Sequence, residues 1–268
     1  MSHAPCLLDE EPGEAAVLAA PVERARDAAL DLRRLLRPGR VLAVLSIVAL
    51  ALAVTSTVAR LTIARITPDT YRGVVEILQR FDMDREHNVP TWFSSQLLFG
   101  CALLLGAIGL TRRPWRLRRG DCTQPDVWPW LALAAAFAYL SLDEAANLHE
   151  ILIVPLRSRL DLHGVFYFAW VIPGFFAVAA FGLALRPFVR RLDRVARRRF
   201  LLAGILYVGG ALGMELIGGA CAEAYGFDSL RYLAAMTLEE TLEMLGAAYF
   251  LYALLQHLAR PVPTRLAA

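Results

Sequence analysis

The sequence predicts an all-α protein, a polytopic membrane helix bundle with six transmembrane helices and both termini in the cytoplasm. Three observations lead to this class. Hydrophobic residues make up 57% of the 268-residue chain, and the mean hydropathy is +0.47, which is too apolar for an ordinary soluble domain. Several apolar runs are long enough to cross a hydrocarbon core of about 30 Å. The arginines gather in alternate connections between these runs.

The predicted spans are roughly 41–63, 91–110, 127–150, 164–185, 200–220 and 232–256. Together they form a transmembrane domain over residues 41–258. It lies between a cytoplasmic N-terminal segment, 1–40, and a short cytoplasmic tail, 259–268. Two local features are expected within the spans. Pro173-Gly174 should kink span four. The glycines of span five should allow close helix packing; they are Gly209, Gly210, Gly213, Gly218 and Gly219.

Arginine placement predicts the orientation of the bundle. The connections after spans two and four are rich in arginine, whereas the other short connections carry few. Cytoplasmic loops carry the excess of positive charge, so both arginine-rich loops and both termini are predicted to be cytoplasmic. All 28 basic residues are arginine, which is typical of a GC-rich bacterium, and a bacterial plasma (inner) membrane is the predicted location. The arginine clusters lie where topology already requires them, so nothing indicates a nucleic-acid partner. The lipid bilayer is the predicted partner.

The long outer connection, residues 64–90, contains an amphipathic pattern that predicts an interfacial helix at about 70–82. The run that follows, Asp82-Met83-Asp84-Arg85-Glu86-His87, superficially resembles a calcium-binding loop. It lacks the glycine and the twelfth-position glutamate that such a loop requires. Trp92, Tyr167 and Trp170 lie near predicted outer edges and are interpreted as an aromatic belt.

The most informative stretch is Ser141–Glu150, near the end of span three. It places four ionisable residues within eight positions of an otherwise apolar segment. A charged group at membrane depth costs roughly 2.5–3.5 kcal/mol on insertion scales. On a helix continuing through Glu150, Asp143, Asn147 and Glu150 share one face with Tyr139. Glu144 and His149 lie on either side of that face.

Two other spans carry acids at a matching depth. Span six contains Glu239, Glu240 and Glu243 on one arc of the helix, and span five contains Glu215. With a rise of 1.5 Å per residue, Asp143 and Glu215 lie about 24 Å and 22 Å above the inner ends of their spans. Glu239 to Glu243 lie roughly 10–16 Å below the outer face. Three helices therefore bring acids to the same outer half of the membrane.

One interpretation of this cluster is an intramembrane metal site. Carboxylates with one or two histidines suit a divalent metal such as zinc, iron or manganese. A metal-bound water would then hydrolyse a lipid-like substrate or another small-molecule ligand near the outer leaflet. Glu144 and Glu240 are the candidate catalytic residues. The candidate ligands are Asp143, Glu144, His149, Glu150, Glu215, Glu240 and Glu243. The candidate substrate-binding residues are Ser94, Ser95, Gln96, Tyr139, Asn147 and Glu239.

Two alternatives stay open at the level of sequence. The acids suit a relay in proton- or cation-coupled transport, although the inner half of the spans has no matching polar groups. They also suit a membrane scaffold or assembly protein in which they hold an arginine-bearing partner helix. Single acids among them have structural explanations as interfacial groups or as protonated side chains that hydrogen-bond neighbouring helices, but their shared depth and the cost of burying each argue against a structural role for all of them together.

Overall fold

The computed structural model describes residues 37–66, 71–85, 87–118 and 127–259, and for residues 111–118 it describes the backbone alone. Within these residues the chain is helical and contains no strand. The predicted tail beyond Ala259 and most of the predicted N-terminal segment lie outside the described residues. The helices, in chain order, are α2 (Pro38–Ile63), α3 (Arg72–Gln79), α4 (Val89–Arg118), α5 (Val127–Ala146), α6 (Ile153–Leu160), α7 (Val171–Arg191), α8 (Arg194–Val208), α9 (Glu215–Tyr225) and α10 (Leu230–Leu258).

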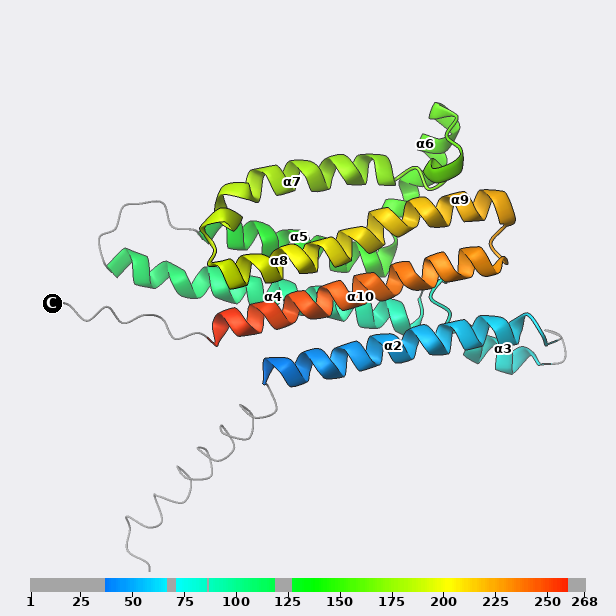
Figure 1. Ribbon diagram of the computed structural model, residues 1–268, viewed down its shortest axis with the longest axis horizontal. Helices are drawn as coiled ribbons and strands as arrows, with labels where there is room; N and C mark the ends of the chain where they lie inside the picture. The colour runs from blue at the N-terminus through cyan, green and yellow to red at the C-terminus, as the bar shows by residue number, and fades with distance from the viewer. Residues whose placement is uncertain (1–36, 67–70, 86, 119–126, 260–268) are drawn as a thin grey trace, which may run out of the picture.

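Short non-α segments join some of these helices. The 3₁₀ turns η1 (His149–Leu152) and η2 (Gly164–Phe166) flank α6, and the π-helical segment η3 (Gly209–Met214) joins α8 to α9. The long helices run side by side as a bundle (Figure 1). α3, α6 and the turn from α9 to α10 lie at one end of this bundle, which we call the α6 end. The turn from α7 to α8 and the C-terminus of α10 lie at the opposite end, the α8 end.

The helices have the length and apolarity of a multi-pass membrane protein. Among the described residues, four segments pass both criteria: α2, Val89–Leu110 of α4, α7, and the continuous run Arg194–Tyr225. α5 and the segment His149–Leu160 count as a fifth span if taken together, although they meet at 73°. α10 has 29 residues, enough to cross a bilayer, but it carries three glutamates. The structure thus supports a membrane-embedded helix bundle with four or five apolar spans.

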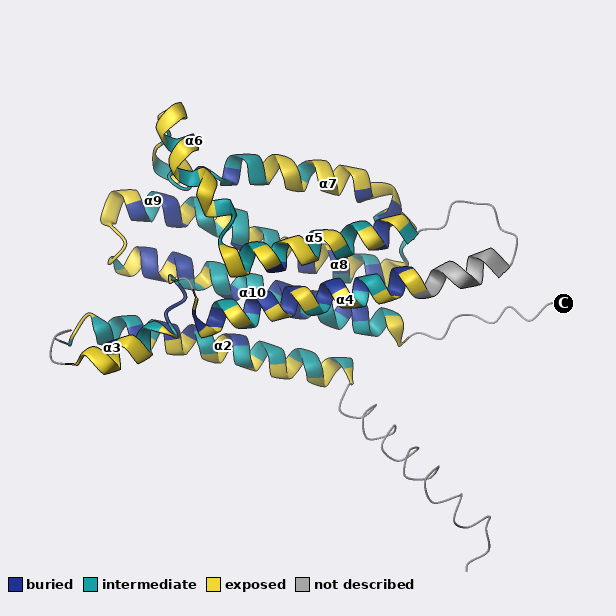
Figure 2. Ribbon diagram, turned by 180° about the vertical axis from the view of Figure 1, so that it is seen from behind, coloured by how far each residue is buried: buried dark blue, intermediate teal, exposed yellow. Residues whose placement is uncertain are grey.

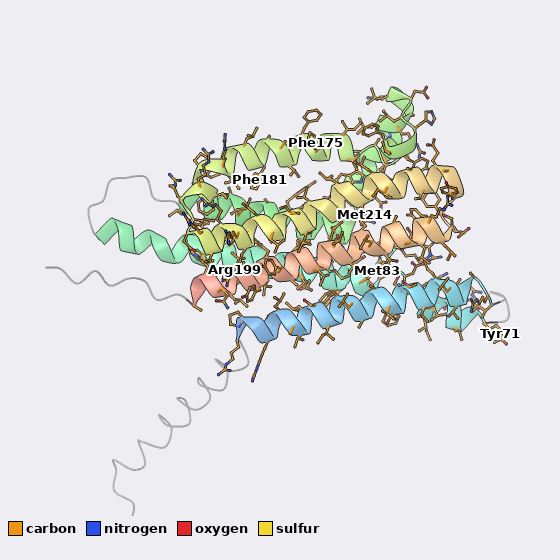
Figure 3. All side chains as sticks on the ribbon, viewed as in Figure 1. Tyr71, Met83, Phe175, Phe181, Arg199 and Met214 are labelled. Carbon is orange, nitrogen blue, oxygen red and sulfur yellow. The ribbon has the colours of Figure 1, made fainter. Side chains whose placement is uncertain are left out.

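α10 is the central helix of the bundle. It packs against α2, α4, α8, η3 and α9, and it lies between α2 and the α8–α9 layer (Figure 1). Buried residues recur along its length, whereas α2 and α7 expose much of their surface (Figure 2). Phe175 and Phe181 of α7 are among these exposed apolar side chains (Figure 3). A polar helix covered by apolar neighbours is the arrangement that spares its acids from contact with lipid.

Glycine lets α8, η3 and α10 approach closely. A methyl group added at Gly246 would lie 2.6 Å from the backbone nitrogen of Tyr207, and one at Gly210 would lie 2.9 Å from the carbonyl oxygen of Glu239. The close packing predicted for span five is therefore present at Gly210, and also at Gly219, where Tyr167 and Phe168 are in contact range. Gly209 and Gly213 have open space instead.

The predicted outline of span three is wrong at its end. α5 stops at Ala146, and Asn147 adopts a left-handed conformation with φ of 48°. The chain then turns through η1 into α6. A left-handed residue cannot continue a right-handed helix, so the assumption of one straight helix through Glu150 fails.

Span four also differs from its predicted limits of 164–185. α7 begins at Val171, and Pro173 occupies its first turn, where no intrahelical donor is lost. Pro173-Gly174 therefore opens the helix and does not kink it.

The α8 end is closed by an apolar layer. Trp130 at the start of α5 makes edge-to-face contacts with Phe188 and Phe200, at ring-centroid distances of 5.1 Å and 6.1 Å. Phe250 packs against Phe200 at 4.9 Å. Leu105, Ile108 and Leu254 are fully buried in the same cluster. The polar groups described next lie between this layer and the α6 end.

Candidate functional site

The first part of the site is a histidine–aspartate pair created by the turn after α5. The backbone N–H of His149 donates to Oδ1 of Asp143 at 2.9 Å, and its ring Nδ1 lies 2.7 Å from Oδ2. Both side chains are largely buried, with 27% of His149 and 13% of Asp143 exposed. The left-handed Asn147 turns the chain back, and this turn brings His149 to Asp143 on the preceding helix.

A tryptophan extends this pair to the next helices. The His149 ring packs against the Trp170 ring at a centroid distance of 4.5 Å. Trp170, which precedes α7, donates from Nε1 to Oε1 of Glu215 at 2.7 Å. Glu215 is the first residue of α9, directly after the π-helical segment. The wider turn of a π segment shifts the phase of the residues that follow it, which gives the site a contact that α-helical spacing does not predict.

The acids of α10 complete the cluster. Glu239 lies beside Glu215 and interacts with it both by charge and by hydrogen bonding. Glu240 and Glu243 are within electrostatic range of Glu144 and Glu215. The Tyr207 ring is partly buried and lies within electrostatic range of Glu243, Glu144, Asp143 and Glu240. The structure therefore brings six carboxyls from α5, α9 and α10 into one neighbourhood inside the bundle.

The predicted substrate-binding residues do not all lie in the acid cluster. Ser94 is fully buried, and its hydroxyl lies beside Glu144. Ser95 instead joins α4 to α5: its hydroxyl donates to the Ser141 carbonyl and the Ser141 hydroxyl donates to the Ser95 carbonyl, both at 2.9 Å. Gln96 is exposed, on the other side of α4.

The remaining predicted residues lie at the edge of the cluster. Tyr139 is 54% exposed and is within electrostatic range of Asp143. Asn147 supplies the turn, and Glu150 is exposed beyond it. The single face predicted for Asp143, Asn147 and Glu150 does not form, because the helix ends between them.

The predicted metal ligands are close together but are not arranged as a metal site. No group of three or more His, Cys, Asp or Glu side chains in the described part of the chain is placed to hold a metal ion. The contacts are pairs, such as Asp143 with His149 and Glu215 with Trp170. The metal interpretation therefore gains no geometric support.

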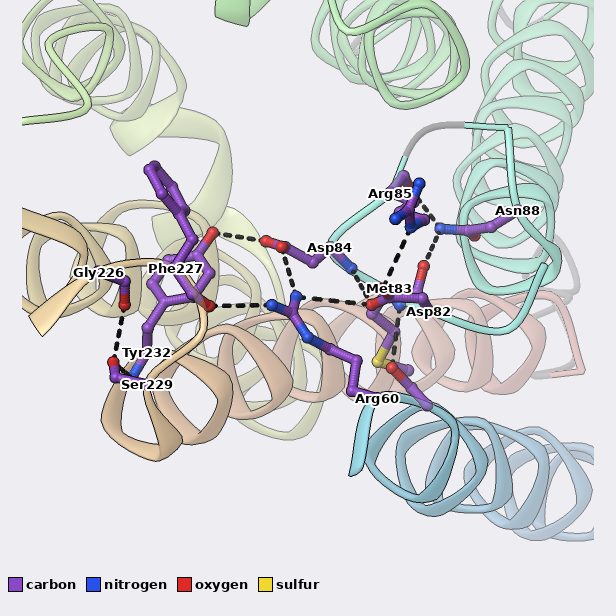
Figure 4. Close-up of polar contacts among 11 residues, drawn as sticks. Arg60, Asp82, Met83, Asp84, Arg85, Asn88, Gly226, Phe227, Ser229 and Tyr232 are labelled. Carbon is purple, nitrogen blue, oxygen red and sulfur yellow. Dashed lines mark hydrogen bonds and ion pairs between the residues drawn. The ribbon is translucent and has the colours of Figure 1, made fainter. Parts of the chain in front are cut away.

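Sequence reasoning missed an ionic network at the α6 end, drawn in Figure 4. Arg60, in the last turn of α2, forms an ion pair with Asp84, lies 3.7 Å from Asp82, and donates to the Phe227 carbonyl at 2.9 Å. Tyr232 of α10 donates to Asp84 at 2.5 Å. The aspartates of the segment that resembles a calcium-binding loop therefore interact with the Arg60 side chain. Arg60 within an apolar span was the available signal, because a cation at that depth requires an acidic partner.

The segment that carries these aspartates folds into the bundle. Asp82, Met83 and Asn88 are all buried. The Met83 N–H donates to the Ser56 hydroxyl at 2.9 Å, and the Asn88 amide donates to the Asp82 carbonyl at 2.7 Å. Burial raises the pKa of Asp82 despite the opposing effect of Arg60. Tyr232 is within electrostatic range of Glu215 and Glu239, so this network adjoins the acid cluster.

Comparison with known proteins identifies the family to which the chain belongs. Residues 41–258 match the domain of unknown function DUF8692, and the chain belongs to that family. Neither a curated protein nor a solved structure matches the chain. The matched residues coincide with the helix bundle, so the ionic network and the acid cluster both lie within the family domain.

Proposed function

We propose that this DUF8692 protein is a six-span protein of a bacterial inner membrane whose acid cluster takes up and releases protons during transport of a cation. Both termini are cytoplasmic in this proposal, and the α6 end faces outward. The distribution of arginine supports this orientation, because the arginine-rich end of α4 and the turn from α7 to α8 both lie at the α8 end of the bundle.

The observation that carries the proposal is the gathering of six carboxyls inside an apolar bundle. They are Asp143, Glu144, Glu215, Glu239, Glu240 and Glu243. The strongest electrostatic influences on Glu239, Glu240 and Glu243 come from other carboxyls. Adjacent carboxyls in a low-dielectric site cannot all be ionised without strong repulsion. Protons or an incoming cation relieve this repulsion, so binding of a cation displaces protons.

The surroundings of the acids support a division of roles. Asp143 and Glu215 accept hydrogen bonds from His149 and Trp170, which hold these two carboxylates in place. Glu239, Glu240 and Glu243 project from α10, the helix with neighbours on most sides. Ser94 offers a buried hydroxyl beside Glu144. We assign Glu215 and Glu239 to cation binding, and Glu240 and Glu243 to storage of protons.

The two ends of the bundle differ in a way that suits transport. Polar groups lie between the acid cluster and the α6 end, including Tyr232, Asp84 and Arg60. The α8 end is closed by aromatic rings and leucines. A transport cycle then requires the apolar layer to separate, with Trp130 and Phe188 as the contact to be broken.

The packing of the two unusual spans supports a six-span topology. The α5–α6 segment crosses the membrane through α5 and then bends, leaving α6 at the outer surface. α10 crosses as a sixth span, because its acids face α9, η3 and α5 and not lipid. An even number of spans places both termini on one side.

The proposal is tested in proteoliposomes that hold a pH-sensitive dye. An inward or outward pH gradient is imposed, and sodium, potassium, magnesium or ethylammonium is added outside. We expect the wild type to dissipate the gradient with one of these cations, and Glu239→Gln to abolish the response. Glu76→Gln, an exposed acid on α3, is the matched control and should behave as wild type.

Infrared spectroscopy of the same samples gives an independent measurement. The wild type should show a band of protonated carboxyl groups, and Glu240→Gln, at a residue assigned to proton storage, should remove part of that signal. Elemental analysis completes the test. Stoichiometric zinc, iron or manganese would favour the metal-dependent enzyme instead. Absence of both cation response and proton binding would leave the scaffold role.

A further inference from the structure

A second site lies at the α6 end, apart from the acid cluster. After the 73° bend, α6 projects from the bundle. Residues 151–166, which include α6, expose large apolar side chains and also carry arginine. They are Ile151, Leu152, Val154, Leu160, Val165 and Phe166. A short helix with this composition, joined to a membrane span, lies in the interface between acyl chains and headgroups.

A hollow of about 330 Å³ lies between α6, the loop after it and the end of α9. Val154 and Leu162 provide its apolar lining. Its polar lining consists of Arg157, Ser158, Asp161, His163, Tyr167 and Glu223. Asp161 shapes this hollow, because its left-handed conformation, with φ of 50°, ends α6 and turns the chain back toward α9.

Arg157 supplies an available positive charge. Its guanidinium carbon lies 4.2 Å from the centroid of the Tyr167 ring. This stacking fixes the guanidinium plane and leaves its N–H groups for an acceptor. Within the described residues Arg157 takes part in no ion pair. Ser158, which also lines the hollow, donates its hydroxyl to the Pro155 carbonyl at 3.3 Å.

The acids of the hollow are used unequally. Glu223 accepts from the Gly164 N–H and lies 2.8 Å from Nδ1 of His163, so both of its oxygens are engaged. Asp161 has a single contact, 3.3 Å from Nε2 of His163, and its side chain is 97% exposed. The hollow thus presents one cation, Arg157, whose charge also acts on Glu223, and one largely exposed anion, Asp161.

We propose that this hollow binds the headgroup of phosphatidylethanolamine. The phosphate accepts from Arg157, the ammonium group donates to Asp161, and the acyl chains lie along the apolar side chains of α6. The pairing of opposite charges selects a zwitterion that carries N–H donors over an anionic headgroup. This inference goes beyond cation transport and depends only on the membrane setting of the bundle.

The test uses native mass spectrometry of the full chain from mixed micelles of phosphatidylethanolamine, phosphatidylcholine and phosphatidylglycerol. We expect preferential retention of phosphatidylethanolamine by the wild type. Loss of a charge-assisted phosphate contact in Arg157→Gln should lower that retention about tenfold. Arg159→Gln is the matched control, because Arg159 lies on the same helix but does not line the hollow. It should change retention less than twofold.

Asp161→Asn provides a second variant that preserves the fold, since asparagine tolerates the left-handed conformation. It should bring retention of phosphatidylethanolamine down to that of phosphatidylcholine. An equal loss of phosphatidylethanolamine retention in Arg157→Gln and Arg159→Gln would show that the hollow is not the binding site. Equal retention of phosphatidylglycerol and phosphatidylethanolamine by the wild type would contradict the preference for a zwitterionic headgroup. Displacement of the lipid by soluble O-phosphoethanolamine at equal concentration would overturn a lipid as the ligand. All variants should keep the wild-type cation response in proteoliposomes, which separates this proposal from the transport function.

Discussion

At the scale of single residues, the structure is defined by which charges find a partner. Arg60 is 14% exposed and pairs with Asp84, while Asp82 beside it is 7% exposed. Removing one member of a buried ion pair leaves the other charge without compensation, and this usually costs more than the pair itself contributes. The acid cluster and the ionic network therefore respond differently to substitution: the network contains its own cation.

The first prediction concerns this cation. Arg60→Gln should lower the free energy of unfolding by about 3 kcal/mol, because Asp82 and Asp84 stay buried without their arginine. Thermal unfolding in detergent measures the effect, and Arg60→Gln/Asp84→Asn should recover part of it. Arg72→Gln removes the exposed pair with Glu76 and should cost less than about 0.5 kcal/mol. Equal losses in the two single variants would show that the network does not stabilise the fold.

The second prediction is a pH dependence at His163. Glu223 and Asp161 accept hydrogen bonds from the His163 ring, and these contacts raise the pKa of His163 above 6.5. A raised folded-state pKa means that this contribution to stability is fully present below pH 6.5 and is lost as the pH rises through the folded-state pKa. The melting-temperature difference between wild type and His163→Gln should therefore shrink from pH 6 to pH 9. High salt should reduce it at pH 6, because His163 is exposed. A difference that is constant with pH would contradict the assignment.

At the scale of elements, irregular backbone places the functional side chains. The left-handed Asn147 ends α5 and returns His149 to Asp143. The π segment Gly209–Met214 precedes Glu215 and sets its direction toward Trp170. Regular helices in both places would separate these partners, so the cluster depends on two local departures from α-helical geometry.

The third prediction tests the turn after α5. Asn147→Gly should be nearly neutral for stability, since glycine adopts the left-handed conformation readily. Asn147→Val should cost about 1–2 kcal/mol, because a β-branched side chain is strained there. It should also weaken the contact between His149 and Asp143, seen as a changed His149 ring signal in NMR spectra. Similar stability of the two variants would argue against the turn as a fixed feature.

The fourth prediction tests the glycine contacts of α10. Gly246→Ala should lower the free energy of unfolding by about 1–3 kcal/mol, because its methyl group meets the Tyr207 backbone at 2.6 Å. Gly204→Ala on α8 has nothing within 4 Å and should gain up to about 1 kcal/mol from helix propensity. Thermal unfolding of the two variants compares them directly. Matching effects would show that α8 and α10 are not in close contact.

At the scale of the whole molecule, one polar helix is surrounded by apolar ones. The acids of α10 lie beside Glu215 of α9 and within electrostatic range of Glu144 of α5, and α2, α4 and α8 pack against other parts of α10. The polar groups lie toward the α6 end and the aromatic layer toward the α8 end. This asymmetry along the bundle axis is the property that transport from one side would use.

The fifth prediction concerns orientation. In a variant without the native cysteines, Glu76→Cys should react with a membrane-impermeant thiol reagent from outside, because α3 lies at the α6 end. Arg194→Cys, exposed at the start of α8, should react only after the membrane is opened. Labelling of both positions from the same side would overturn the six-span topology, and the reverse pattern would invert it.

The sequence by itself determined the helical class, the apolar helices of a multi-pass membrane protein and most of the acids that meet, with Glu150 as the exception. Those properties depend on composition, apolar length and rise per residue, which are local quantities. Depth alone brought Asp143, Glu215 and Glu239 to one level. It could not show which side chains touch, because rotation of each helix about its axis is set by packing against its neighbours.

Only the tertiary structure decided the partners. The bend at Asn147 removed Glu150 from the cluster and gave His149 to Asp143. Trp170 proved to be a hydrogen-bond donor to Glu215 and not merely an interfacial ring. Arg60 reached Asp84 across 24 residues of sequence. Such contacts depend on a left-handed residue, a π turn and a buried loop, each of which is stable only because neighbouring helices enclose it, and no window of sequence contains those neighbours.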